Sequence, residues 1–126
     1  MASRCVLVVD DEPAMLRMLV DGLCESGWEA SPAEGGTDAL ELLRGGGFAA
    51  VVSDVRMRDG DGFSLLRSIR ALGDPVPVIL MSSFGSRSAE SQARSAGAFA
   101  YLDKPFTLGE LLEVLGRLPS PSRQEP

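Results

Sequence analysis

Several short apolar runs in this chain each end in a residue that can take part in chemistry, and this pattern constrains the fold most. Continuous runs rich in β-branched residues are typical of strands that are covered on both faces, as in parallel sheets. Because open α/β sheets place their sites where parallel strands end, we expect these polar side chains to meet at one edge. The runs are Cys5–Val9 before Asp10 and Asp11, Phe48–Ser53 before Asp54, Val78–Met81 before Ser82, and Ala98–Leu102 before Asp103 and Lys104.

Apolar stripes with helical spacing separate the runs. After Pro13, which suits the first turn of a helix, leucines and a valine recur at i, i+3, i+4 and i+7 as far as Leu23. Similar stripes predict helices over 36–43, 65–72, 88–95 and 107–115, and a capping box opens the last one. The stripe in 88–95 contains only alanines, so we expect this helix to be the most weakly anchored.

One strand differs from the others because it ends without a reactive residue. Trp28–Ser31 is less apolar, and Pro32, which we expect to close it, indicates an edge strand. Strand and helix therefore alternate five times, which predicts an α/β fold with a doubly wound parallel sheet and helices on both faces. We expect a single domain over residues 1–118, followed at 119–126 by a flexible tail or the start of a linker.

Composition excludes several classes of function. The net charge of −6 is unlike that of a nucleic-acid-binding protein, and the absence of histidine removes histidine metal sites and histidine bases. No apolar run approaches the roughly 20 residues that span a bilayer, and the N-terminus lacks a signal-peptide pattern. We therefore expect a cytoplasmic protein without membrane contact, whose two cysteines are reduced core residues, Cys5 and Cys24.

The polar residues after the strands suit phosphoryl transfer to a carboxylate. A carboxylate that attacks phosphorus is an anion approaching an anion, so a divalent cation is needed between them. Mg²⁺ is usually held by one or two carboxylates together with waters and the phosphate. We predict Asp54 as the nucleophile, Asp11 and Asp54 as direct Mg²⁺ ligands, and Asp10 as a ligand through water. Ser82 and Lys104 would bind phosphoryl oxygens.

Taken singly, each of these residues has a simpler interpretation. Two aspartates after a strand are more often a cap at the start of a helix, and a single Asp after a strand is usually structural. A serine pair can be ordinary loop polarity, and a lone lysine a solvated surface charge. Their occurrence at four of the five strand ends favours a shared site.

In order and spacing, these motifs resemble the receiver domain of bacterial response regulators over residues 5–118. The matching segments are Val8-Val9-Asp10-Asp11-Glu12-Pro13, Ser53-Asp54-Val55-Arg56-Met57, Asp61-Gly62, Pro77-Val78-Ile79-Leu80-Met81-Ser82 and Asp103-Lys104-Pro105-Phe106.

The resemblance implies a flavodoxin-like (βα)5 sheet of order 2-1-3-4-5. It implies that Asp54 receives a phosphoryl group from the phosphohistidine of a sensor histidine kinase or phosphotransfer protein, with Mg²⁺ as the cofactor. By the same resemblance, Asp10 and Asp11 belong to the acidic metal pocket, and the backbone carbonyl of Arg56 is a further ligand. Ser82 corresponds to the switch hydroxyl, and Lys104 to the lysine before a proline that is usually cis.

Tyr101 corresponds to the family's aromatic switch residue. Once Ser82 moves towards the phosphoryl group, the ring would turn into the vacated space. The alternative is a half-buried core aromatic whose hydroxyl lies in water. The output face implied by the resemblance is formed by 88–95, 98–102 and 107–115. It would bind a downstream protein target or output domain, with the chain a monomer or a phosphorylation-dependent dimer.

Two residues depart from the family pattern. Arg58 stands where proline is usual, and Gly60 where a hydrophobic residue is common. Both should loosen the loop after Asp54 and affect metal affinity and phosphoryl lifetime. We also expect the side chains of Arg56 and Phe84 to flank the site and to influence water access.

Two other functions remain open from the sequence. One is a pseudo-receiver, which would use the same fold as an unphosphorylated docking module. The other is a small flavodoxin-like enzyme that hydrolyses phosphate esters. The sequence offers no general acid or base beyond Asp54 and no substrate pocket for such an enzyme, and the intact set of polar residues argues against the docking module.

Overall fold

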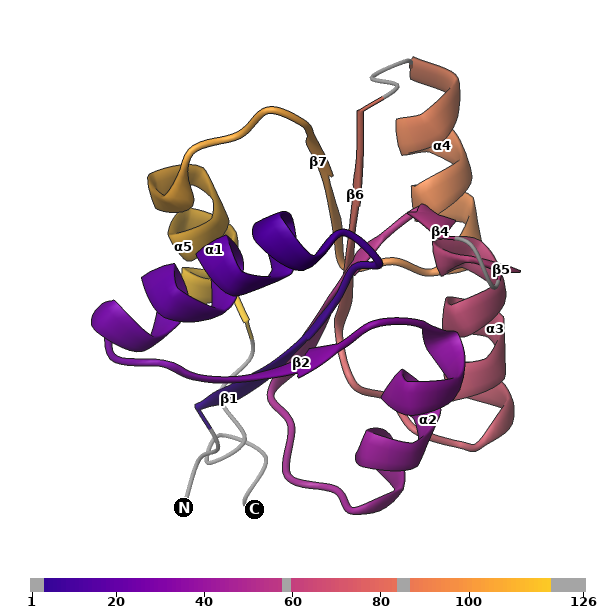
Figure 1. The fold of residues 1–126 in the computed structure, drawn as a ribbon. Coiled ribbons are helices and arrows are strands. Elements are labelled where there is room, and N and C mark those ends of the chain that lie inside the picture. The colour runs from indigo at the N-terminus through magenta and orange to yellow at the C-terminus, as the bar shows by residue number, and fades with distance from the viewer. Residues whose placement is uncertain (1–3, 58–59, 84–86, 119–126) are drawn as a thin grey trace, which may run out of the picture.

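The computed structural model describes residues 4–57, 60–83 and 87–118, with the side chains of 87 and 88 left out. Its main sheet has five parallel strands in the order β2-β1-β3-β6-β7 (Figure 1). Because β6 and β7 are the fourth and fifth strands of this sheet along the chain, the predicted order 2-1-3-4-5 is confirmed. The strands are β1 (Cys5–Val9), β2 (Glu29–Ala33), β3 (Ala50–Asp54), β6 (Val78–Ser82) and β7 (Ala100–Asp103).

Five helices cover the sheet on both sides, as a doubly wound fold requires. In Figure 1, α1 and α5 lie on one side of the sheet, and α2, α3 and α4 lie on the other. Within the described ranges, no helix has the length and apolar content needed to cross a membrane. The helices are α1 (Pro13–Glu25), α2 (Gly36–Arg44), α3 (Gly62–Ala71), α4 (Arg87–Ala96) and α5 (Leu108–Gly116).

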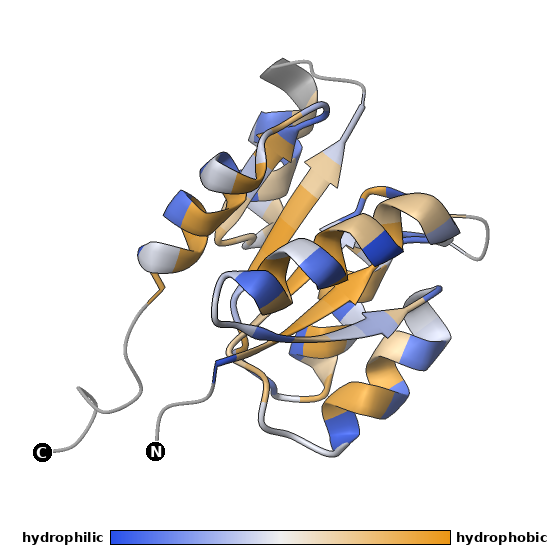
Figure 2. Cartoon of the chain, turned by 60° about the vertical axis from the view of Figure 1, so that its left-hand side comes forward, coloured by the Kyte–Doolittle hydropathy of each residue, from blue (hydrophilic) through white to orange (hydrophobic). Residues whose placement is uncertain are grey.

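The sheet separates two hydrophobic cores. Side chains alternate across a strand, so Val6 and Val8 of β1 join the core under α1 and α5. Leu7 and Val9 join the core under α2, α3 and α4. Figure 2 shows the result, with apolar strands inside and polar residues on the outer helix faces. Burial on both faces explains why β1, β3 and β6 are nearly continuous apolar runs.

The edge strand β2 is longer than expected. We expected Pro32 to end it, but the strand continues to Ala33, with Pro32 paired beside Val8. Glu29 N donates to Arg4 O, and Ala33 O accepts from Asp10 N, so alternate residues of β2 bond to β1. The backbone of Pro32 faces away from β1, and its missing N–H is therefore not needed there.

Three further details differ from the sequence analysis. β3 begins at Ala50 and β7 at Ala100, each two residues later than predicted; before β7, Ala98 N donates instead to Ala93 O of α4. Cys24 is exposed and not a core residue, although both cysteines are free as expected. The sparse stripe of α4 is confirmed, since Ala93 is its buried residue among the side chains described.

The segment after Asp54, which we expected to be a loop, forms two short antiparallel strands. They are β4 (Arg56–Met57) and β5 (Gly60–Asp61), and Met57 pairs with Gly60. Gly60 has a φ of 134°, which other residues rarely adopt, so a glycine suits this position. The effect of this departure on the metal and the phosphoryl lifetime stays a prediction. Arg58, Phe84 and the expected tail at 119–126 lie outside the described residues.

Gly62, the first residue of α3, lies directly against the end of β3. Its N–H donates to Val55 O at 2.8 Å, and a Cβ at this position would lie 2.7 Å from Asp54 O. Asp61 caps the helix by accepting from Ser64 N at 2.7 Å. The start of α3 is thereby fixed to the peptide that follows Asp54.

Replacing Gly62 with alanine should destabilise the protein by about 1–3 kcal/mol, because the new Cβ would force the Asp54 backbone to shift. Urea denaturation measures the change. Gly116→Ala is the matched control, since a Cβ there meets nothing within 4 Å, and it should leave stability unchanged or slightly higher. Equal stabilities for the two variants would contradict the close contact at Gly62.

Candidate functional site

The register of the sheet brings the predicted site residues to one edge. Val9 pairs with Ser53, Asp54 with Met81, and Ser82 with Asp103, so four strands end at the same level. β7 is an edge strand like β2, but the lysine that follows it has a side chain long enough to pass β6. The sheet therefore assembles the charged residues that the sequence separates by up to 94 positions.

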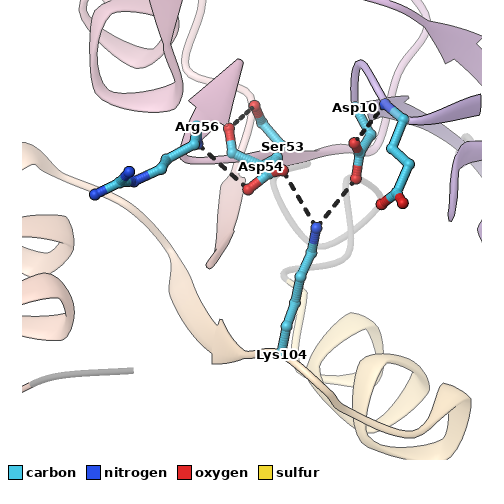
Figure 3. Close-up of polar contacts among 6 residues, drawn as sticks. Asp10, Ser53, Asp54, Arg56 and Lys104 are labelled. Atoms are coloured by element: carbon cyan, nitrogen blue, oxygen red, sulfur yellow. Dashed lines mark hydrogen bonds and ion pairs between the residues drawn. The ribbon is translucent and has the colours of Figure 1, made fainter. Parts of the chain in front are cut away.

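The Lys104 ammonium lies between two carboxylates (Figure 3). Its Nζ donates to Asp10 Oδ2 at 3.3 Å and to Asp54 Oδ2 at 3.2 Å. Only 10% of the Lys104 side chain is exposed, against 1% for Asp10 and 14% for Asp54. The backbone N of Lys104 donates to Ser82 O at 2.8 Å, and the peptide bond to Pro105 is cis. The structure thus brings Lys104, Asp10 and Asp54 together at the end of the sheet.

Asp10 is held on its other oxygen by the chain that leads into α1. Its Oδ1 accepts from the N–H of Glu12 at 2.9 Å, so this side chain also orders the turn before the helix. Glu12 itself occupies the N-cap position and provides no side-chain cap. Asp10 is therefore not the helix cap that the simpler interpretation expected; it orders the turn before α1 with one oxygen and faces Lys104 with the other.

Asp54 ends β3 and also has two partners. Its Oδ1 accepts from Arg56 N at 3.3 Å, and its Oδ2 faces Lys104. In Figure 3 the guanidinium of Arg56 points away from the carboxylate. The position of the Arg56 backbone carbonyl as a metal ligand stays a prediction.

Burial and charge act on the pKa values of this pair in opposite directions. Burial raises the pKa of Asp54; Lys104 lowers it and Asp10 raises it again, and the pKa ends above its ordinary value. For Lys104, burial lowers the pKa, but Asp10 and Asp54 together raise it above its ordinary value. Lys104 therefore stays charged at neutral pH, and Asp54 carries a charge that its surroundings only partly compensate.

The carboxylates form a group suited to a divalent cation. Asp10, Asp11 and Asp54 each offer an oxygen, and these oxygens all lie within 4.8 Å of one another. Carboxylate oxygens are the ligands that Mg²⁺ prefers, and Mg²⁺ keeps several waters when few protein ligands are available. With three carboxylates around one lysine, the group has excess negative charge. The donor set therefore fits the predicted metal.

Ser82 and Tyr101 lie together on β6 and β7. Ser82 is 3% exposed at the end of β6. The Tyr101 hydroxyl is buried, and the described residues give it no hydrogen-bond partner, so the alternative of a hydroxyl in water is wrong. Burial, followed by nearby Asp103, raises the pKa of Tyr101, whereas Ser82 lowers it. The phenol thus lies near both side chains, and the role of Tyr101 in a switch stays a prediction.

Ser53 is a site neighbour that we did not single out from the sequence. Its side chain is completely buried beside Asp54, in a strand whose other buried residues before the aspartate are apolar. Its Oγ donates to the backbone carbonyl of Asp54 at 3.0 Å (Figure 3). The sequence signal that could have identified Ser53 is its position as a polar residue within an otherwise apolar run.

Comparisons with known proteins point to one family. Residues 6–116 match the response regulator receiver domain. The chain is 38% identical over 107 residues to response regulator MprA of Mycobacterium sp. (strain KMS), covering 85% of this chain and 46% of MprA. It is 35% identical over 119 residues to the transcriptional regulatory protein ZraR of Salmonella typhimurium, covering 94% of this chain and 27% of ZraR. It thus spans less than half the length of either relative.

The fold is also similar to that of solved structures. Chemotaxis protein CheY4 of Vibrio cholerae superimposes with a TM-score of 0.87 at 28% identity, covering 94% of this chain and all of that chain.

Magnesium should stabilise the protein through the three carboxylates. A ligand that binds only the folded state at 100 times its Kd adds about 2.7 kcal/mol to the free energy of unfolding. We expect Asp11→Ala to remove this gain in thermal denaturation with and without Mg²⁺. Asp38→Ala is the control, because it removes the same charge from α2 outside the cluster and should keep the response. An unchanged response in Asp11→Ala would exclude this residue as a ligand.

Asp54→Asn should be at least as stable as the wild type near neutral pH without divalent cations. The folded-state pKa of Asp54 is raised, so its ionisation opposes folding. This cost is absent below the unfolded-state pKa of about 3.9 and develops as the pH rises through the folded-state pKa. Denaturant unfolding should show the gain near pH 7 and lose it near pH 3. A variant less stable at neutral pH would show that Lys104 outweighs burial.

Proposed function

Because this chain belongs to the response regulator receiver domain family, we propose that Asp54 accepts a phosphoryl group in a Mg²⁺-dependent step. The donor is the phosphohistidine of a sensor histidine kinase or of a phosphotransfer protein. The observation that carries this proposal is the Lys104 ammonium, which lies 3.2 Å from the Asp54 carboxylate beside two further aspartates. A carboxylate, a cation and an acidic metal pocket are the groups that this transfer needs.

In the proposed step, a carboxylate oxygen of Asp54 attacks phosphorus and forms an O–P bond. The P–N bond of the donor breaks, its electron pair stays on the imidazole nitrogen, and that nitrogen takes up a proton. Asp11 and Asp54 directly, and Asp10 through water, would hold Mg²⁺, which when bound would supply positive charge to the phosphoryl oxygens. Lys104 stays protonated and moves from the Asp54 carboxylate to a phosphoryl oxygen.

Ser82 and Tyr101 would communicate the change to a partner. The buried Ser82 hydroxyl donates to a phosphoryl oxygen, since phosphorylation adds strong acceptors at this edge. The Tyr101 phenol, already buried near Ser82, then takes a new position. The face of α4, β7 and α5 is the proposed binding surface for a downstream protein or output domain, in a monomer or a phosphorylation-dependent dimer.

The limited anchorage of α4 supports this choice of surface, because switching elements are drawn from regions of low stability. As a signalling domain, the chain would catalyse only its own phosphorylation and dephosphorylation. The proposed site of this reaction is the cytoplasm.

A small acyl-phosphate donor with Mg²⁺ should give a phosphate adduct on the wild-type protein that hydroxylamine releases. Asp54→Asn should abolish the adduct, because it removes the nucleophile. Lys104→Met should reduce the rate by about 100-fold or more, the loss typical when one preorganised donor to a developing charge is removed. Mass spectrometry of the intact protein measures the adduct.

The outcomes separate the three interpretations of the sequence. An Asp54-dependent adduct supports the receiver. A wild-type protein without an adduct under any Mg²⁺ concentration indicates a pseudo-receiver that acts by docking. Continuous release of phosphate from many esters, with or without Asp54, indicates a hydrolase.

A further inference from the structure

Ser53 is a buried polar side chain that the proposed mechanism does not use. Among the described residues, the buried polar or charged ones are Asp10, Ser53 and Ser82. Asp10 and Ser82 belong to the site. Ser53 directly precedes the nucleophile Asp54, and its hydroxyl therefore needs an explanation.

Packing alone does not favour serine at this position. In the register of the sheet, its neighbours on the adjoining strands are Val9 and Leu80, which are both completely buried. A β-branched apolar residue would suit such a strand better, and a buried hydroxyl costs free energy unless it forms a hydrogen bond. Ser53 forms this bond to the Asp54 carbonyl at 3.0 Å.

The peptide that contains the Asp54 carbonyl is also held at its N–H group. The N–H of Val55 donates to Met81 O at 2.8 Å, which ties the other end of the Asp54–Val55 peptide to β6. Gly62 packs against Asp54 O so closely that no Cβ fits between them. Rotation of this peptide would turn the Cα of Asp54 and move its carboxylate relative to Lys104.

We propose that Ser53 is a positioning residue whose hydroxyl, through the Asp54 carbonyl, fixes the Asp54 carboxylate between the metal pocket and Lys104. This inference rests on the proposed phosphoryl transfer to Asp54. Ser53 touches no reacting atom; it acts by setting the backbone orientation of the nucleophile. Groups that orient a metal ligand or nucleophile in this way affect both metal affinity and rate.

Variants at Ser53 test the hydroxyl separately from side-chain volume. Ser53→Ala removes the hydroxyl, while Ser53→Thr and Ser53→Val have the same shape and differ in the hydroxyl alone. We expect Ala and Val to weaken Mg²⁺ binding and to slow phosphorylation by the acyl-phosphate donor, each by about 10-fold, as is typical for residues that orient a metal ligand. Ser53→Thr should retain more of the Mg²⁺ affinity and of the phosphorylation rate than Ser53→Val. Calorimetry with Mg²⁺ alone gives the affinity, and the adduct assay gives the rate.

Val51→Ala is the control for loss of stability. Val51 is completely buried two residues earlier on β3, on the same face of the strand, and it has no polar group. It should be destabilised in denaturant and yet keep the wild-type Mg²⁺ affinity and phosphorylation rate. The positioning role of Ser53 is overturned if Val51→Ala loses Mg²⁺ affinity and phosphorylation rate to the same extent as Ser53→Ala. It is also overturned if Ser53→Ala keeps the wild-type affinity and rate.

The result for the wild type separates this inference from the proposed function. A wild type that forms no adduct refutes phosphoryl transfer itself. A wild type that forms the adduct, with unaltered Ala and Val variants, refutes only the role of Ser53. If Ser53→Thr fails to fold, the comparison of Ser53→Ala with Val51→Ala decides the outcome.

Discussion

The ionic contact of Lys104 with Asp10 and Asp54 is the interaction on which the site depends. The ammonium of Lys104, just after β7, can reach the carboxylates at the ends of β1 and β3 only if these three strands and β6 end at one level. The register in turn depends on apolar side chains that fill both cores, because a shift by one residue would exchange the two faces of every strand. The register that forms the sheet therefore also brings the site residues together.

The ionic contact with Lys104 does not neutralise the site, because three carboxylates leave an excess of negative charge. Burial, and to a smaller extent repulsion by Asp10, raise the pKa of Asp54 above its ordinary value in spite of Lys104. A divalent cation would relieve the repulsion, and so would transfer of Lys104 to a new anionic group. The folded protein thus holds a local electrostatic cost at the place where a cation and a phosphoryl group are proposed to bind.

Much of the fold and the site follows from local patterns in the sequence. Apolar β-branched runs and leucine stripes identify the strands and helices, and polar residues at strand ends identify Asp10, Asp54, Ser82 and Lys104 because parallel strands share an edge. Features that arise from long-range geometry are not predictable in this way. Whether Pro32 ends a strand depends on which side its backbone faces, and the role of Gly62 depends on the approach of a distant carbonyl. The hydrogen bond from Ser53 to the Asp54 carbonyl depends on the folded conformation of both residues, which the sequence does not specify.

The outward-facing proline of β2 has a consequence for assembly. An exposed edge of a sheet offers a row of backbone groups on which a foreign strand can add, and many proteins associate or aggregate in this way. Pro32 is the fourth of the five residues of β2 and has no amide hydrogen, so an incoming chain would lose one backbone hydrogen bond in the new pairing. The proline thus makes this edge of the sheet a poor site for association through an added strand.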